Sequence, residues 1–127
     1  ELTRPKELVQ IMSKKTDTII IPGELPDMNQ IISASKDHWG SYSSLKKANT
    51  QLVAFCTKQA TKQKYKKIDL DITWYCKDRR KDKDNIMAGT KFILDGLVAA
   101  GTIKEIRHKF DVDKQDPRVE VKITEVS

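Results

Sequence analysis

The run KIDLDITWYCKDRRKDKDNIMAGTKFILDGLVAAG, residues 67–101, decides the fold because it predicts a strand, a charged junction and a helix in direct succession. Residues 67–76 alternate between apolar and polar side chains, as a strand with one buried face does. The apolar face carries Ile68, Leu70, Ile72, Trp74 and Cys76. The other face carries Asp69, Asp71, Thr73 and Tyr75. We expect an internal strand that packs one face on a helix and leaves Asp69 and Asp71 in water.

Helical spacing follows over residues 84–100, and Gly101 is expected to end this helix. Its apolar positions share one face: Ile86, Ile93, Leu97 and Ala100, flanked by Leu94. A second helix is predicted over residues 41–63. Its apolar face is Leu45, Leu52, Cys56 and Ala60, with Val53 beside it.

The remaining segments complete an α+β pattern. Residues 17–22 form a β-branched run stopped by Pro-Gly, which indicates a strand. Residues 23–41 show no clear period and are interpreted as a long loop with room for one helical turn. Strands are predicted over 106–113 and 118–126, with the turn KQDP between them. We therefore predict an α+β fold: a small mixed β-sheet with two main helices packed on it and a C-terminal β-hairpin.

Length, composition and net charge limit the classes of function that this chain can have. The chain has 127 residues, of which 38% are apolar and 33% charged, and a net charge of +6. This length suits one domain, over residues 12–127, with residues 1–11 as a vector-derived segment or flexible arm. The positive charge favours a polyanionic partner, usually nucleic acid, although many small basic proteins are merely soluble. No apolar run approaches the ~20 residues that span a membrane.

Cysteine and histidine give little sign of a metal site. Cys56 and Cys76 lack metal-binding spacing, and we interpret them as reduced thiols of a cytoplasmic protein. His108 alternates with apolar residues and is expected to be packed and hydrogen-bonded, while His38 has no partner at a recognisable spacing. The sequence contains no P-loop, glycine-rich nucleotide motif or nucleophile elbow.

The junction between strand and helix holds two carboxylates, Asp82 and Asp84. Four basic residues surround them: Arg79, Arg80, Lys81 and Lys83. If the chain is extended here, both carboxylates project to one side, and their repulsion favours an intervening cation such as Mg²⁺. The alternative is a solvated loop in which Asp84 caps the helix.

Lys91 follows Asp84 by seven residues, which places it on the same helical face. There it could stabilise negative charge on an attacked phosphate. The alternative is an ordinary i,i+4 pair with Asp95.

The string RRKDKDNIMAGTKFILDGLVAAG resembles the signature of RusA-type Holliday junction resolvases, particularly those of phages and prophages of Gram-positive bacteria. The late segment VDKQDPRVEVKI and the early segment IIIPGELPDMNQ are similar to the same subgroup and fall in the correct order. The resemblance covers roughly Thr18 to Ile123.

This resemblance implies a cytoplasmic, phage- or prophage-encoded homodimer of DNA recombination and repair that resolves four-way DNA junctions by paired nicks. It needs Mg²⁺, with Mn²⁺ as a substitute, and no small-molecule cofactor or membrane. Asp82 and Asp84 would be catalytic metal ligands, and Lys91 the active-site lysine, although its spacing is about one turn longer than in the enterobacterial form. The DNA contacts would come from Asn29, Arg79, Arg80, Lys81 and Lys83.

The chain departs from the family pattern after Gly101, where a third metal-binding Asp is expected. Only Glu105 is available there, because Asp111 and Asp113 fall with Arg107 on a strand face. Either Glu105 substitutes, or the site lacks a ligand, or the printed sequence joins across a mobile loop between Ile103 and Ile106. We favour the last, which the mass of the intact chain would test. The competing functions are an inactive relative that binds branched DNA and a basic scaffold module.

Overall fold

The computed structural model describes residues 15–37, 39–98 and 101–126. The predicted arm 1–11 lies outside the described residues, as do His38 and Ala100. In the described ranges, no helix is long and apolar enough to cross a bilayer.

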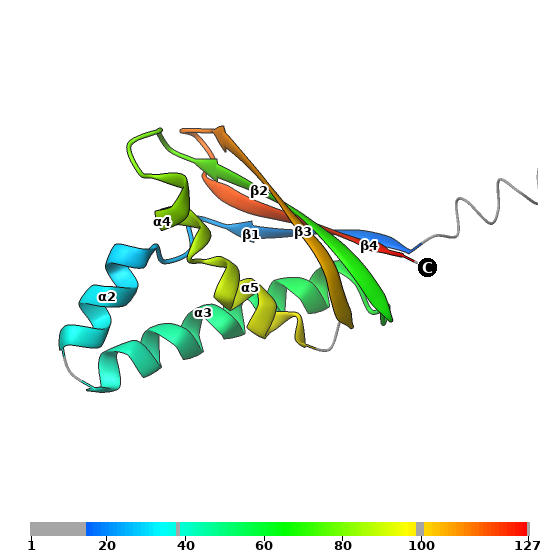
Figure 1. Cartoon of the computed structure of the whole chain (residues 1–127), viewed down its shortest axis with the longest axis horizontal. Helices are drawn as coiled ribbons and strands as arrows, with labels where there is room; N and C mark the ends of the chain where they lie inside the picture. The colour runs from blue at the N-terminus through cyan, green and yellow to red at the C-terminus, as the bar shows by residue number, and fades with distance from the viewer. Residues whose placement is uncertain (1–14, 38, 99–100, 127) are drawn as a thin grey trace, which may run out of the picture.

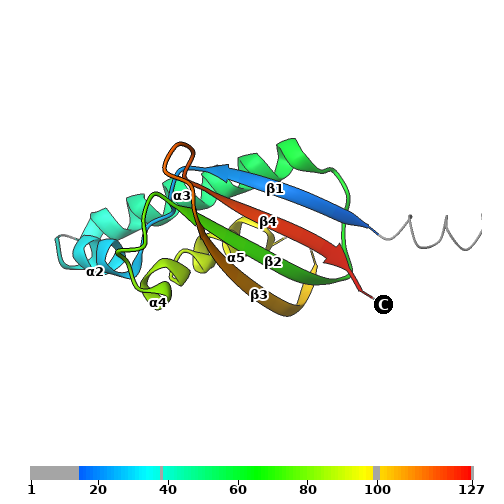
Figure 2. The ribbon, with the colours of Figure 1, turned by 90° about the horizontal axis from the view of Figure 1, so that it is seen from above.

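A four-stranded sheet forms one layer of the molecule (Figure 2). Its strands lie in the order β1-β4-β2-β3, with β2 parallel to β3 and antiparallel to β4. The strands are β1 (Thr16–Pro22), β2 (Lys67–Cys76), β3 (Thr102–Val112) and β4 (Arg118–Glu125). The predicted α+β class with a mixed sheet is confirmed, and β2 is internal as expected.

The two C-terminal strands follow one another through a short turn, and the chain reverses direction between them, as predicted. They lie on opposite sides of β2, however, so each pairs with β2 and not with the other. The turn crosses the end of β2, where Asp113 N donates to the Cys76 carbonyl over 2.8 Å. A turn motif indicates a reversal of the chain but not which strands become neighbours.

All the helices lie on one side of the sheet (Figure 1). They are α2 (Met28–Asp37), α3 (Trp39–Ala60), α4 (Lys83–Met87) and α5 (Thr90–Gly96). Of these, α3 matches the helix predicted over residues 41–63, and it packs against α5 and β1. Its buried residue is Val53, whereas Ala60, assigned to the apolar face, is exposed. The helix predicted over residues 84–100 is present but divided into α4 and α5.

Close packing at Gly89 accompanies this division. Gly89 is buried, and a Cβ there would stand 3.0 Å from Leu25 Cβ and 3.2 Å from Trp74 Cζ3. Its N–H donates to the Ile86 carbonyl, a 3₁₀-type bond of 3.1 Å, before the α-helical pattern resumes. Beyond the break, α5 packs against α3, whereas α4 approaches α2.

The predicted long loop 23–41 is wrong for most of its length, because residues 28–37 form α2. A reciprocal capping box starts this helix. Asp27 Oδ1 accepts from Gln30 N over 2.8 Å, and Gln30 Oε1 accepts from Asp27 N over 2.9 Å. None of the α2 residues is fully buried, although Ile31 packs against the core.

The core lies between the helices and the inner face of the sheet. It includes the apolar face predicted for β2 up to Trp74, while Cys76 is only partly buried. The other fully covered side chains among the described residues are Ile19, Ile21, Val53, Phe92, Ile93, Val119, Val121 and Ile123. On the outer face, Arg107 binds Asp71 over 2.6 Å and Asp69 over 3.6 Å, so these aspartates lie on the sheet's polar face as expected.

Candidate functional site

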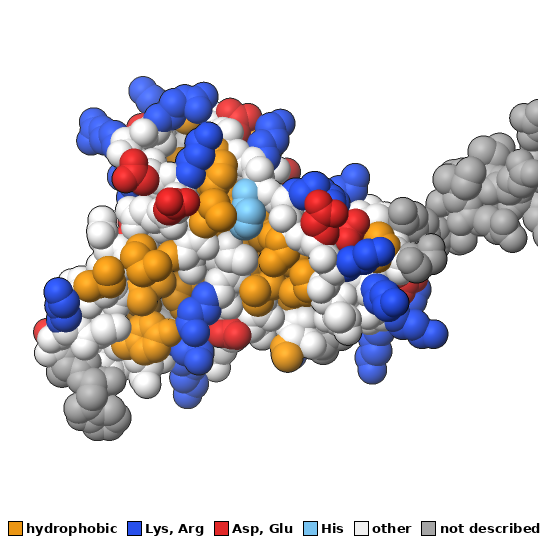
Figure 3. Space-filling model, in the orientation of Figure 1, with side chains coloured by type: hydrophobic (Ala, Val, Ile, Leu, Met, Phe, Trp, Pro, Cys, Tyr) orange, Lys and Arg blue, Asp and Glu red, His pale blue; other side chains and the backbone are white. Residues whose placement is uncertain are grey.

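The charged junction lies at the C-terminal end of β2, where the chain turns into α4 opposite the start of α2 (Figure 1). The two segments together line an open hollow. Its residues are Met28, Asn29, Lys81, Asp82, Lys83, Asp84 and Asn85. Basic side chains gather over this end of the molecule, with acidic ones beside them (Figure 3). The fold therefore brings Asn29 to Asp82 and Asp84, although more than fifty residues separate them in sequence.

Asp82 and Asp84 both face this hollow, but through different backbone geometry. Asp82 is the N-cap residue of α4, with extended backbone at φ −66° and ψ 146°, and its side chain makes no capping hydrogen bond. Asp84 lies in the first turn of the helix, so the predicted cap at Asp84 is wrong. Among the described residues, neither carboxylate forms an ion pair, and both are exposed. Two carboxylates without cationic partners therefore lie on one hollow.

The neighbouring basic residues have different surroundings. Lys81 Nζ lies 2.6 Å from Asp27 Oδ2, and Lys83 Nζ lies 5.5 Å from the centre of the Phe110 ring. Arg80 has a loose contact of 3.7 Å with Asp78 and an 89% exposed side chain. Arg79 is exposed in the same loop. The two arginines are consequently the side chains most available to a phosphate backbone.

Asp27 is the acid that sequence reasoning missed. It is 5% exposed and is the buried charged residue of the described chain. Burial opposes its ionisation, but hydrogen bonds from Lys81 and from the Gln30 amide outweigh burial and lower the pKa of the carboxyl. The string DMNQ, residues 27–30, carried the signal, because Asp followed three residues later by Gln is a capping box.

A second tie joins α2 to the junction. The Asn29 backbone N–H donates to Asn85 Oδ1 over 3.1 Å. The start of α2 is therefore attached on both sides of Asp82 and Asp84, through Lys81 and through Asn85.

Lys91 and Glu105 do not join this group. Lys91 is an exposed residue of α5, beyond the break at Gly89, and does not line the hollow. Glu105 pairs with Asp69 near the start of β2, seven residues before Cys76, which is roughly 23 Å along the strand. Arg107 Nη1 binds Glu105 over 3.1 Å. The parallel register of β2 and β3 thus places Glu105 at the opposite end of the sheet.

The segment from Ile103 to Ile106 lies within an unbroken β3, with a register irregularity opposite Ile68 and Asp69. This strand start lies at the end of the sheet away from Asp82. The inserted loop considered above stays a prediction.

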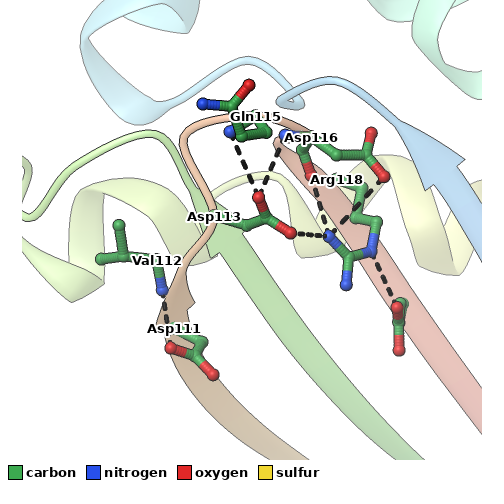
Figure 4. Close-up of polar contacts among 7 residues, drawn as sticks. Asp111, Val112, Asp113, Gln115, Asp116 and Arg118 are labelled. Atoms are coloured by element: carbon green, nitrogen blue, oxygen red, sulfur yellow. Dashed lines mark hydrogen bonds and ion pairs between the residues drawn. The ribbon is translucent and has the colours of Figure 1, made fainter.

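The aspartates further along β3 have partners in the strand and the following turn (Figure 4). Asp113 accepts from the Gln115 and Asp116 amides and binds Arg118 Nη1 over 2.7 Å. Arg118 also binds Glu120 over 2.8 Å. Asp113 therefore has a structural role in the β3–β4 turn.

The hollow offers some of the oxygen donors that a divalent cation needs. Within the described ranges there is no group of three or more His, Cys, Asp or Glu side chains that could enclose a metal. The hollow does hold two free carboxylates and two carboxamides. Mg²⁺ is commonly held by one or two carboxylates, waters and substrate phosphates, so the residues fit an open site of that kind.

Neither a protein-family model nor a curated protein matches this chain.

Proposed function

We propose that the protein is a Mg²⁺-dependent endodeoxyribonuclease that cuts branched DNA, with Asp82 and Asp84 as its metal ligands. The observation that carries this proposal is the pair of exposed carboxylates on one hollow, which have no ion-pair partner among the described residues and lie close in sequence to the exposed Arg79 and Arg80. Its preference for four-way junctions rests on the sequence resemblance to RusA-type resolvases.

The surroundings of each residue suggest its role in the proposed reaction. A bound Mg²⁺ would supply a nucleophilic hydroxide near neutral pH and neutralise charge on the attacked phosphate. Arg79 and Arg80, exposed beside the hollow, hold the DNA backbone through charge-assisted hydrogen bonds. Asn29 and Asn85 place amide groups at the edge of the same hollow. Lys91 does not line the hollow, so the role proposed for it rests on the sequence resemblance.

A second candidate function is branched-DNA binding without cleavage. The observation in its favour is that the described residues bring no third acid to Asp82 and Asp84, and that Glu105 lies at the other end of the sheet. The basic loop would bind DNA equally well in such a protein.

Incubation with a synthetic four-way junction, with and without Mg²⁺, separates the two functions. For a nuclease we expect paired nicks that disappear in Asp82→Asn and Asp84→Asn while junction binding persists. Glu105→Gln is the matched control and should cut normally. Salt-sensitive binding with no cleavage would select the second function. Equal affinity for a linear duplex would exclude both.

Paired nicks on a two-fold symmetric junction also require two symmetry-related sites, and hence a homodimer. Sedimentation at micromolar concentration should show a dimer. A protein that sediments only as a monomer would not make paired cuts.

A further inference from the structure

The hollow at the junction has no net formal charge from its lining, since Lys81 and Lys83 offset Asp82 and Asp84. The structure does not pair these groups with each other. Lys81 Nζ contacts Asp27 at 2.6 Å, and Lys83 Nζ lies over the Phe110 ring. Both ammonium groups therefore have neighbours other than Asp82 and Asp84. Among the described residues, these two carboxylates have no cationic partner.

Asp27 is well suited to hold Lys81 in place. Its side chain is 6% exposed, whereas that of Lys81 is 37% exposed. The capping box with Gln30 fixes the other carboxylate oxygen, so Asp27 cannot turn away without breaking the start of α2. A buried carboxylate strongly favours a paired cation, because an unpaired charge there is costly.

We infer that Asp27 is a positioning residue: by binding Lys81, it keeps this ammonium away from Asp82 and Asp84 and leaves them available to a divalent cation. This inference rests on the proposed function. It also assigns Lys81 a role within the protein, in place of the DNA contact expected from the sequence. The hydrogen bond between Asn29 and Asn85 supports the same arrangement, because it ties the residue after Asp84 to the helix that carries Asp27.

Direct binding of Mn²⁺ to the full chain, followed by electron paramagnetic resonance without DNA, tests this inference. In Asp27→Asn, Lys81 loses its partner and can approach the carboxylates. A unit positive charge about 4 Å from a divalent cation in a water-like medium reduces the affinity for that cation roughly thirtyfold. We therefore expect the Mn²⁺ dissociation constant of Asp27→Asn to rise about thirtyfold.

The double variant Asp27→Asn/Lys81→Met identifies the cause. If the freed ammonium is responsible, its removal restores the dissociation constant to within about twofold of the wild-type value. If Asp27 only stabilises α2, the double variant binds Mn²⁺ as weakly as Asp27→Asn, which would overturn the inference. Glu105→Gln, an acid changed at the far end of the sheet, should bind as the wild type does.

Lys81→Gln alone keeps the inference testable if Asp27→Asn does not fold, because glutamine can still donate a hydrogen bond to the buried Asp27 carboxylate. Because Lys81 is already held by Asp27, its removal should change Mn²⁺ affinity less than twofold. A tightening of about thirtyfold would show that Lys81 already neutralises the carboxylates, contrary to the inference. Mn²⁺ binding that is lost in Asp82→Asn but unaffected in Asp27→Asn overturns this inference alone. A wild-type protein that binds no Mn²⁺ at millimolar concentration overturns the proposed metal site as well.

Discussion

Trp74 and His108 are joined across the parallel strands β2 and β3: the indole Nε1–H donates a hydrogen bond of 3.1 Å to His108 Nδ1. Their rings are stacked with centroids 6.1 Å apart, and Phe110 continues the stack along β3. The packed, hydrogen-bonded role predicted for His108 is confirmed. Because Nδ1 accepts the bond, the imidazole is neutral in the fold, and burial lowers its pKa.

Stability should therefore decrease in mild acid. The pKa of His108 in the fold lies below its value of about 6.5 in the unfolded chain, so the unfolded chain binds more protons between the two values. The free energy of unfolding should fall as pH drops through about 6.5 and level off below the folded pKa. Urea unfolding at pH 7.5 and 5.5 measures this, and His108→Gln, which can still accept the bond but does not titrate, should lose that part of the pH dependence.

Gly96 allows α5 to approach α3 closely. A Cβ at this position would lie 2.5 Å from Val53 Cγ1 and 3.1 Å from the Ala54 backbone N. Gly96→Ala should destabilise the protein by about 1–3 kcal/mol, because overpacking exceeds the gain in helix propensity. Urea unfolding measures the loss. Gly96→Ala should cost less stability in a Val53→Ala background than in the wild type, because the shorter side chain leaves room for the new methyl group. An equal cost in both backgrounds would contradict the clash.

Arg118 holds the β3–β4 turn together. Its guanidinium binds Asp113 and Glu120 and lies 3.8 Å from the centre of the Tyr75 ring. The hydrogen bond from Arg118 lowers the pKa of Asp113. Arg118→Met should lower the urea midpoint at pH 7, since it leaves two carboxylates close together. The deficit should shrink as pH falls and the carboxylates take up protons. Arg118→Lys should keep only part of the stability, because it lacks the planar fork.

The arginines of the junction should contribute more to DNA affinity than Lys81. Each of Arg79→Gln and Arg80→Gln should weaken junction binding and reduce the salt dependence by about one unit of slope. Lys81→Gln should have a smaller effect, because its ammonium is bound to Asp27. Fluorescence anisotropy over a salt series provides the measurement, with Lys104→Gln at the far end of the sheet as control. Equal losses of DNA affinity in the three junction variants would contradict the expected difference between the arginines and Lys81.

The sequence predicted those elements whose apolar pattern is also their packing pattern. The alternation in β2 gave its buried face up to Trp74, since a strand inside a sheet must bury every second residue. Helix α2 was not predicted, because its start is set by the hydrogen bonds between Asp27 and Gln30 and not by burial. The interruption at Gly89 depends on contact with Leu25 and Trp74, which are distant in sequence.

The candidate site was predictable only where its members are close along the chain. Asp82 and Asp84 face one hollow, as their spacing suggested, although one caps a helix and the other lies in its first turn. The family pattern, which has an acid shortly after the helix, offers Glu105 as one candidate third ligand. Strand register decides the position of Glu105, which lies at the opposite end of the sheet from Asp82 and Asp84. Asp27 belongs to the group only through the tertiary contact with Lys81.

The strand order has a consequence for how the protein is made. Among the residues that the structure describes, β1 pairs with β4 alone, and β4 also separates β1 from β2. During synthesis the first strand must therefore wait, without a hydrogen-bonded neighbour, until Arg118–Glu125 has left the ribosome. Such long-range pairing slows folding and exposes strand edges in the meantime. The β2–α4–α5–β3 unit can assemble earlier, and insertion of β4 would then close the sheet in a single late step.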